Sequence, residues 1–122
     1  MTLDPEPRQR ERRQHQRVAF NAAAELQTKP AMRLPIRTRN ISLGGLSVLH
    51  TVELAPETRC IVHAVIPESR GGSTPVQLRG RVVNCQFNKI EGGFMVSLQF
   101  IDLSASVAAT IARFMHGRQG AH

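Results

Sequence analysis

Apolar residues alternate with polar or small residues in six segments of the chain, and this period of two is typical of strands with one buried face. The alternation is clearest over residues 18–26 and 94–100. The other four segments cover residues 33–41, 46–52, 60–66 and 76–87. The run at 60–66 is almost wholly apolar and indicates a central strand. Pro35 places the start of its segment at a sheet edge, because proline cannot donate a ladder hydrogen bond.

Turn-forming residues separate these segments. Clusters rich in Gly, Pro, Asn and Ser or Thr lie at 40–45, 55–58, 67–75 and 88–93, and Lys29-Pro30 forms the first turn. The cluster at 67–75 contains two adjacent glycines, so we expect a flexible hairpin loop there. Gly80 lies inside a strand segment and indicates a bulge or bend.

The pattern changes to a helical period after Asp102. Val107, Ile111, Phe114 and Met115 recur at helical spacing, which predicts one amphipathic helix. Ser104 is suited to cap its start and Gly117 to mark its end. The sequence therefore predicts an all-β fold with one helix: a six-stranded antiparallel β-barrel that a C-terminal α-helix plugs or flanks.

Length and composition indicate one domain. The 122 residues, 41% hydrophobic and 20% charged, fit a single soluble globular domain. No apolar run is long enough to cross a membrane, and the N-terminus lacks the apolar stretch of a signal peptide, so we expect a cytoplasmic protein without membrane insertion. Cys60 and Cys85 lie in apolar segments and are expected to be buried thiols rather than a disulfide or metal ligands.

Arginine carries the positive charge. The net charge is +7, and Lys29 and Lys89 are the only lysines. Five arginines gather near the N-terminus, at positions 8, 10, 12, 13 and 17. We expect residues 1–12 to form a flexible basic arm, 13–117 a single domain and 118–122 a tail. The arginines indicate a partner that carries phosphates, without identifying it.

Two groups of residues suit recognition of a nucleotide. Arg13 and Arg17, separated by three residues in the pattern Arg-x-x-x-Arg, offer guanidinium forks that match phosphate oxygens or the O6/N7 edge of guanine. Asn40, Ser42 and Gly45 follow in the pattern Asn-x-Ser-x-x-Gly between two predicted strands. Each group also has an ordinary explanation: a solvated basic tail, and a hairpin turn whose side chains bond their own backbone. Alternatively, exposed amides in this turn form an anion-binding nest.

Together the two groups resemble the signature of the PilZ domain family, an Arg-x-x-x-Arg segment followed by Asp/Asn-x-Ser-x-x-Gly. The stretches 11–13, 18–20, 43–46 and 98–103 are also similar to the family, so the resemblance covers about residues 10–115. It implies a six-stranded antiparallel barrel with a C-terminal helix, in agreement with the strand pattern. It also implies a receptor for the bacterial second messenger cyclic di-GMP, and no cofactor.

The resemblance assigns roles to single residues. Arg13 and Arg17 would hold guanine edges and phosphates, Asn40 and Ser42 would hydrogen-bond a guanine, and Gly45 would permit the close turn. Arg12 directly precedes the pair, and in similar proteins an arginine there accompanies binding of two stacked ligand molecules. The arm would fold over the ligand on binding.

Two departures from the family bear on affinity. Asn40 replaces the frequent Asp, which removes a charge-assisted hydrogen bond. Some relatives carry a stacking aromatic residue near Asn84, where this chain has only Phe87 nearby.

The sequence gives no indication of an enzyme, because no serine or cysteine has a neighbouring base and no carboxylate pair recurs. A PilZ-like module that binds only proteins is the main alternative to a cyclic di-GMP receptor. Nonspecific nucleic-acid binding by the basic arm is a second alternative; we expect no specific nucleic acid. A receptor would act on an unidentified downstream protein, with motility and exopolysaccharide or biofilm control as the pathways that the resemblance implies.

Overall fold

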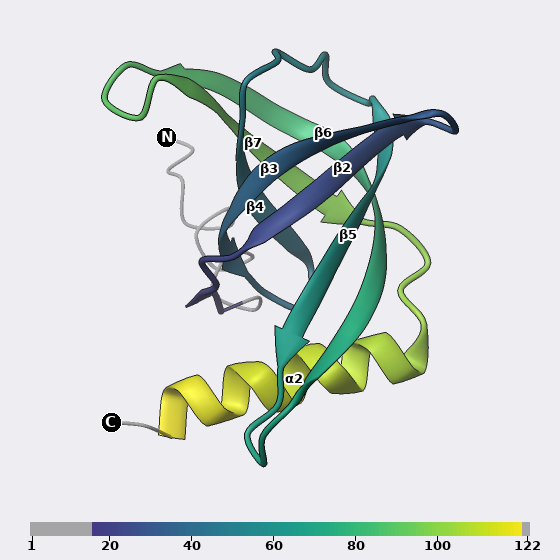
Figure 1. Cartoon of the computed structure of the whole chain (residues 1–122), viewed down its shortest axis with the longest axis vertical. Coiled ribbons are helices and arrows are strands. Elements are labelled where there is room, and N and C mark those ends of the chain that lie inside the picture. The colour runs from purple at the N-terminus through teal and green to yellow at the C-terminus, as the bar shows by residue number, and fades with distance from the viewer. Residues whose placement is uncertain (1–15, 121–122) are drawn as a thin grey trace, which may run out of the picture.

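The computed structural model describes the backbone of residues 16–120 and the side chains of residues 16–118. Strands and one helix follow each other along the chain (Figure 1). The elements are β1 (Val18–Ala19), β2 (Ala23–Lys29), β3 (Met32–Ile41), β4 (Gly45–His50), β5 (Arg59–Pro67), β6 (Ser73–Asn88), β7 (Gly93–Phe100) and α2 (Ala105–Gly120).

The six longer strands close into an antiparallel barrel. Their order around it is β3-β2-β5-β6-β7-β4, and pairing of β3 with β4 closes the ring. This confirms the predicted six-stranded barrel. The two-residue strand β1 adds to β3 and takes no part in the closure, because β3 already pairs with β2 and β4.

The first predicted strand, 18–26, is divided into β1 and β2 by the segment Phe20–Ala22. The hydroxyl of Thr38, fully buried on β3, donates to the carbonyl of Phe20 at 2.5 Å and accepts from the amide of Ala22 at 2.9 Å. Backbone hydrogen bonds continue on both sides, from the Phe20 amide to the Arg39 carbonyl and from the Thr38 amide to the Ala22 carbonyl, both at 2.9 Å. The Thr38 hydroxyl satisfies the two backbone groups that this irregularity leaves unpaired. Both halves still pair with β3, Val18 with Ile41 and Ala23 with Arg37.

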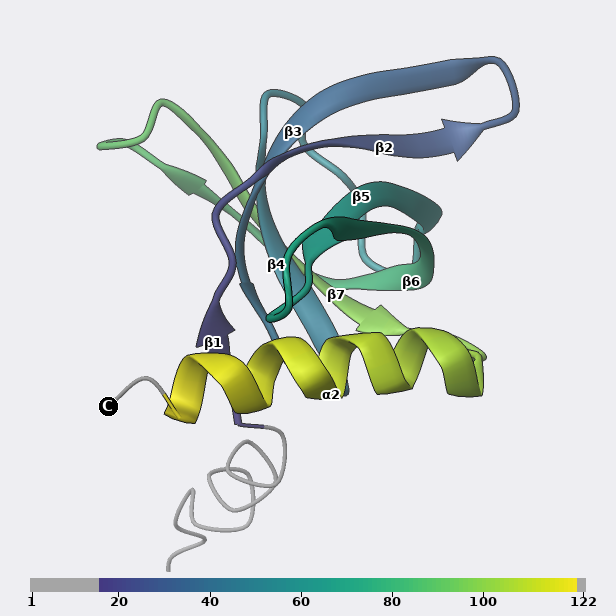
Figure 2. The ribbon, with the colours of Figure 1, turned by 60° about the horizontal axis from the view of Figure 1, so that its bottom comes forward.

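Inward-pointing side chains at alternate strand positions fill the barrel, as the sequence pattern predicts. The helix α2 lies across one end of the barrel (Figure 2) and contributes Ile111 and Met115 to the core. The rings of Phe20 and Phe114 meet edge to face at 5.3 Å between centroids, which ties the segment after β1 to this helix. The members of the core on the strands include Leu26, Ile36, Ile41, Val48, Val62, Leu78, Val82 and Val96.

Two predicted details of the strands are wrong. The hairpin between β5 and β6 is tighter than predicted, because pairing continues to Pro67 opposite Ser73. The bulge in β6 lies at Val83, where the pairing with β7 shifts, and not at Gly80. Gly80 remains in register, and a side chain there would bring its Cβ within 3.1 Å of the Gln99 carbonyl. Close approach of β7 therefore explains this glycine.

The helix begins as predicted and ends later. The Ser104 hydroxyl accepts the amide of Val107 at 3.2 Å, the bond expected of a helix cap. The helix continues through Gly117 to Gly120, so the predicted end is wrong. No helix in the described part of the chain has the length and apolar character needed to span a membrane.

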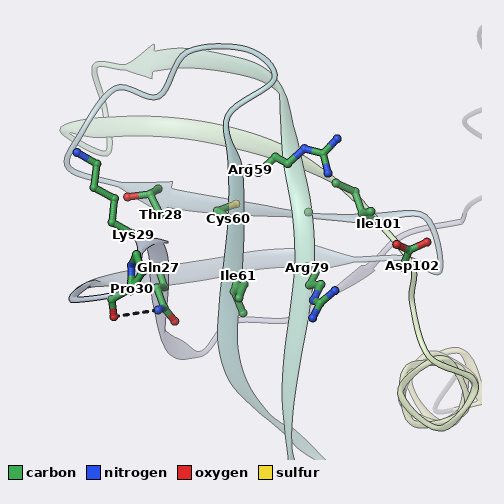
Figure 3. A pocket seen from close by; sticks show the side chains of 11 residues that line it. Gln27, Thr28, Lys29, Pro30, Arg59, Cys60, Ile61, Arg79, Ile101 and Asp102 are labelled. Atoms are coloured by element: carbon green, nitrogen blue, oxygen red, sulfur yellow. Dashed lines mark hydrogen bonds between the residues drawn. The ribbon is translucent and has the colours of Figure 1, made fainter.

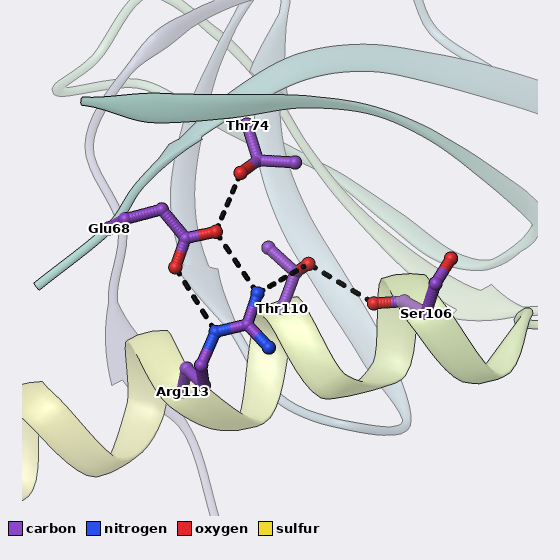
Figure 4. A network of polar contacts seen from close by, with 5 residues as sticks. All are labelled: Glu68, Thr74, Ser106, Thr110 and Arg113. Atoms are coloured by element: carbon purple, nitrogen blue, oxygen red, sulfur yellow. Dashed lines mark hydrogen bonds and ion pairs between the residues drawn. The ribbon is translucent and has the colours of Figure 1, made fainter.

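A network of polar contacts fixes the helix to the β5–β6 hairpin (Figure 4). The Arg113 guanidinium donates to both carboxylate oxygens of Glu68, at 3.2 and 3.1 Å, and the Thr74 hydroxyl donates to one of them at 2.6 Å. Arg113 also reaches the hydroxyl of Thr110 one turn earlier. The hydrogen bonds from Arg113, and then from Thr74, lower the pKa of Glu68.

Glu68→Gln is expected to lower the free energy of unfolding at neutral pH. Because the pKa of Glu68 is lower in the folded state, its carboxylate stabilises the fold above its unfolded-state pKa, and this contribution disappears as the pH falls through the folded-state value. Urea unfolding at several pH values should therefore show the difference from the natural protein shrinking in acid. Glu53→Gln, at an exposed position, is the control; an equal effect from both variants would contradict the role of this network.

Candidate functional site

The turn between β3 and β4 is held by the Ser42 hydroxyl. Its oxygen accepts the amides of Gly44 and Gly45, both at 3.1 Å, and the Ser42 amide donates to the Gly45 carbonyl at 2.9 Å. Ser42 is buried. Its hydroxyl therefore makes the local turn bonds, and the two amides it occupies are not free to form an anion-binding nest.

Gly45 is required by the strand that packs against it. A Cβ at this position would lie 2.1 Å from the carbonyl oxygen of Leu98 on β7, far inside contact distance. Gly45 is also not among the residues with positive φ. The close approach is therefore to the protein's own backbone. Gly44 also contacts β7, because its carbonyl accepts a hydrogen bond from the amide of Phe100 at 3.0 Å.

Asn40 carries an acceptor without a partner. Its Oδ1 atom is buried and makes no hydrogen bond in the described structure. Asn40 pairs with Ser47 on β4, and the Oγ of Ser47 is likewise buried and without a partner. Such a group costs about 1–3 kcal/mol when it is left unsatisfied. The two paired residues thus each carry a polar atom whose hydrogen-bonding capacity is not used by the described residues.

The strand register extends this pair into a row across four strands. Asn40 on β3 lies opposite Ser47 on β4, Ser47 opposite Ser97 on β7, and Ser97 opposite Asn84 on β6. We call these four residues the polar row. Their side chains share the outer face of the barrel, because directly paired residues point to the same side.

The sequence analysis did not select Ser47 or Ser97. The available signal was their position between apolar, inward-facing neighbours, such as Leu46 and Val48 around Ser47. Two arginines close to the row are already engaged. Arg39 forms an ion pair with Glu91. Arg81 forms another with Glu57 at 2.7 Å and donates to the side chain of Gln99 at 2.5 Å.

Arg17 lies at the same end of β3 as the turn. It directly precedes β1, whose Val18 pairs with Ile41, and Ser42 directly follows Ile41. Arg17 is exposed, and no residue in the described part of the chain pairs with its guanidinium. The structure therefore brings Arg17, Asn40, Ser42 and Gly45 together, while Arg12 and Arg13 lie outside the described residues.

The buried titratable groups do not suit a nucleophile. Cys60 is buried, and burial raises the pKa of its thiol to about 11, so the thiol stays protonated at neutral pH. Cys85 is only half-buried, in contrast to the prediction, and both cysteines are free. Burial lowers the pKa of His50, whose Nδ1 accepts the Thr51 amide at 3.0 Å, so its imidazole is neutral.

Solved structures share this fold. The inhibitor of motility MotI/DgrA from Bacillus subtilis superposes with a TM-score of 0.77 at 14% identity, covering 88% of this chain and 51% of that one. YcgR from Escherichia coli in complex with cyclic di-GMP gives 0.67 at 21% identity, covering 90% and 47%. The chain thus spans about half the length of these two proteins. The separate PilZ domain of YcgR with cyclic di-GMP gives 0.65 at 17% identity, covering 90% and 93%.

Sequence comparison identifies the family. No protein of curated function is similar enough in sequence to match. The model of the PilZ domain family, however, matches residues 11–117, which is most of the chain and includes both groups of predicted site residues. The closed six-stranded barrel with its C-terminal helix agrees with this match. The chain therefore belongs to the PilZ domain family.

Proposed function

We propose that this protein is a cyclic di-GMP receptor that binds its ligand beside the β3–β4 turn and is not an enzyme. The observation that carries the proposal is the buried Oδ1 of Asn40, which has no partner among the described residues and lies at the same end of β3 as the exposed Arg17. A guanine supplies N–H donors for the amide oxygen, and a guanidinium suits its O6/N7 edge or a phosphate. The solved complexes of the similar YcgR with cyclic di-GMP support this ligand.

The proposed roles divide into contact and support. Asn40 accepts hydrogen bonds from a guanine, and Arg13 and Arg17 hold guanine edges and phosphates. Ser42 and Gly45 support the site by fixing the turn, because the Ser42 oxygen already accepts two backbone amides and Gly45 admits β7. We assign Arg12 to the binding of a second, stacked ligand molecule.

Binding would be transmitted through the N-terminal segment. The arm before β1 would fold over the ligand and present a changed surface to a downstream protein in motility or in exopolysaccharide and biofilm control. The similarity to an inhibitor of motility supports the first pathway at the level of the fold. We propose that a single domain spans residues 13–117. We also propose that the protein is cytoplasmic and does not insert into a membrane.

A protein-binding module without a nucleotide is the second candidate. The hairpin between β6 and β7 favours it, since Phe87 is 61% exposed and Ile90, near its tip, is 96% exposed. Exposed apolar side chains at a hairpin tip are suited to contact another protein. If this candidate is right, the folded protein does not bind cyclic di-GMP.

Isothermal titration with cyclic di-GMP at moderate salt tests the proposal. We expect micromolar binding, about −8 kcal/mol, with no comparable heat from GTP or cyclic di-AMP. A ratio near two ligands per chain would support the role given to Arg12. Equal binding of all three nucleotides, disappearing steeply with salt, would indicate nonspecific attraction. No heat and no ligand-induced stabilisation would favour the protein-binding module.

Asn40→Asp is expected to tighten binding of cyclic di-GMP about fivefold, close to 1 kcal/mol, because a carboxylate makes a charge-assisted hydrogen bond to guanine. The free variant should melt at a lower temperature, since the buried oxygen at this position has no partner and would become charged. Titration and thermal unfolding measure the two effects. Asn88→Asp, where the side-chain oxygen already accepts the Glu91 amide, is the matched control and should leave affinity unchanged.

A further inference from the structure

A groove with a basic lining lies on another side of the barrel. It has a volume of about 410 Å³ and lies over β2, β5 and β6, beside the segment that leaves β7 (Figure 3). Its cations are Lys29, Arg59 and Arg79, and half-buried Ile61 and Ile101 provide apolar contact area between them. We call these five residues the basic groove.

The cations of the basic groove are not neutralised by the fold. Lys29, Arg59 and Arg79 are exposed, and none is within ion-pair distance of a carboxylate in the described structure. The lining contains one carboxylate, Asp102, against the three cations. By contrast, Arg81 next to the groove is paired with Glu57.

The strand register holds two arginines against each other. Arg59 on β5 lies directly opposite Arg81 on β6, an arrangement that costs stability because like charges face each other across the strands. Glu57 offsets the charge of Arg81, whereas Arg59 has no ion-pair partner in the described structure and is available to an anion from outside the protein. Arg79 lies opposite Ile61, so its guanidinium borders the apolar surface.

We infer that the basic groove binds an acidic segment of a partner protein. Carboxylates of such a segment pair with the three free cations, and an apolar side chain between them rests on Ile61 and Ile101. No aromatic residue in the described part of the chain lines the groove, so it lacks the ring surface on which proteins that bind single strands stack successive bases.

The basic groove lies close to the proposed ligand site. The register runs from Gly45 to Gln99 on β7, to Arg81 on β6 and to Arg59 on β5. At the usual spacing between strands, Arg59 is about 14 Å from the turn. A partner bound in the groove would therefore lie close enough to respond to structural changes at the ligand site. This consequence rests on the proposed function, whereas the inferred docking surface does not depend on it.

A titration followed by nuclear magnetic resonance tests the inference. The probe is a blocked peptide of alternating glutamate and leucine, added to the full chain at 150 mM salt, with the glutamine version as control. We expect chemical-shift changes to cluster at Lys29, Arg59, Ile61, Arg79 and Ile101. The double variant Arg59→Glu/Arg79→Glu should bind the peptide at least tenfold more weakly and keep its affinity for cyclic di-GMP.

Arg70→Glu, on an exposed turn at the other end of the β5–β6 hairpin, reverses one charge where the double variant reverses two, and is the control for net charge. Equal weakening by this variant, or shifts that centre on Arg17, would overturn the inference in favour of general electrostatic attraction. Shifts in the groove with inorganic pyrophosphate or single-stranded DNA but not with the peptide would also overturn it. If the natural protein bound the peptide in the groove but did not bind cyclic di-GMP, the proposed function would be contradicted and the inferred docking surface would stand.

Discussion

Gly45→Ala is expected to destabilise the protein by about 2–3 kcal/mol, a typical cost of overpacking. The new methyl group would lie 2.1 Å from the carbonyl oxygen of Leu98, and a backbone atom in a paired strand cannot move aside as a flexible side chain can. Either β4 separates from β7 or the turn held by Ser42 opens. Both outcomes disturb Asn40, so ligand binding should weaken as well.

Urea unfolding measures this cost, and Gly117→Ala is its control. At position 117 the nearest atom to a new Cβ is 4.0 Å away, in the side chain of Ser69, and alanine favours a helix over glycine by about 1 kcal/mol. The same chemical change should therefore destabilise at one site and stabilise at the other. A Gly45 variant with an unchanged urea midpoint would show that β7 does not constrain this position.

Arg17→Ala is expected to weaken binding of cyclic di-GMP at least 100-fold, about 2.7 kcal/mol, without changing the stability of the free protein. Arg17 is exposed and forms no ion pair with the described residues, so we expect its removal to act on the ligand alone. Charge-assisted hydrogen bonds of a guanidinium to guanine or phosphate account for a loss of this size. Titration calorimetry and thermal unfolding provide the two readouts.

Arg70→Ala removes the same charge from an exposed turn away from the site and should leave affinity within about twofold. If both variants lost affinity equally, the contribution of Arg17 would be net charge and not position. The salt dependence separates the cases further, because each phosphate contact that is lost lowers the slope of affinity against salt.

The strands were predictable because each buries one face. Leu26 and Leu78 are buried and apolar, and the residues on either side of each are polar and point outward, so the period of two is visible without any tertiary information. The break after β1 was not predictable in this way. It depends on a hydroxyl from Thr38, 16 residues further along the chain than Ala22, and no local preference of residues 20–22 indicates it.

The candidate site residues can be selected from the sequence as a group, whereas the contacts that two of them make in the fold cannot. Ser42 and Gly45 stand out by spacing in the sequence, yet the reason for the glycine is a carbonyl of β7, more than 50 residues away. The polar row depends on the register shift at Val83, which brings Asn84 opposite Ser97. A register is a property of paired strands, so it cannot be derived from one strand alone.

The closure of the barrel without β1 has a consequence for how the protein rearranges. Among the described residues, opening the segment before Phe20 breaks the two pairings of Val18 and Ala19 with β3 and the packing of Val18 on the core, while the six-stranded ring stays paired. Phe20, buried against Phe114, and the Thr38 hydroxyl stop this opening from spreading into β2. We therefore expect the segment to have its own local unfolding equilibrium, with a free energy well below that of global unfolding, so that the proposed ligand would change its position without loosening the domain.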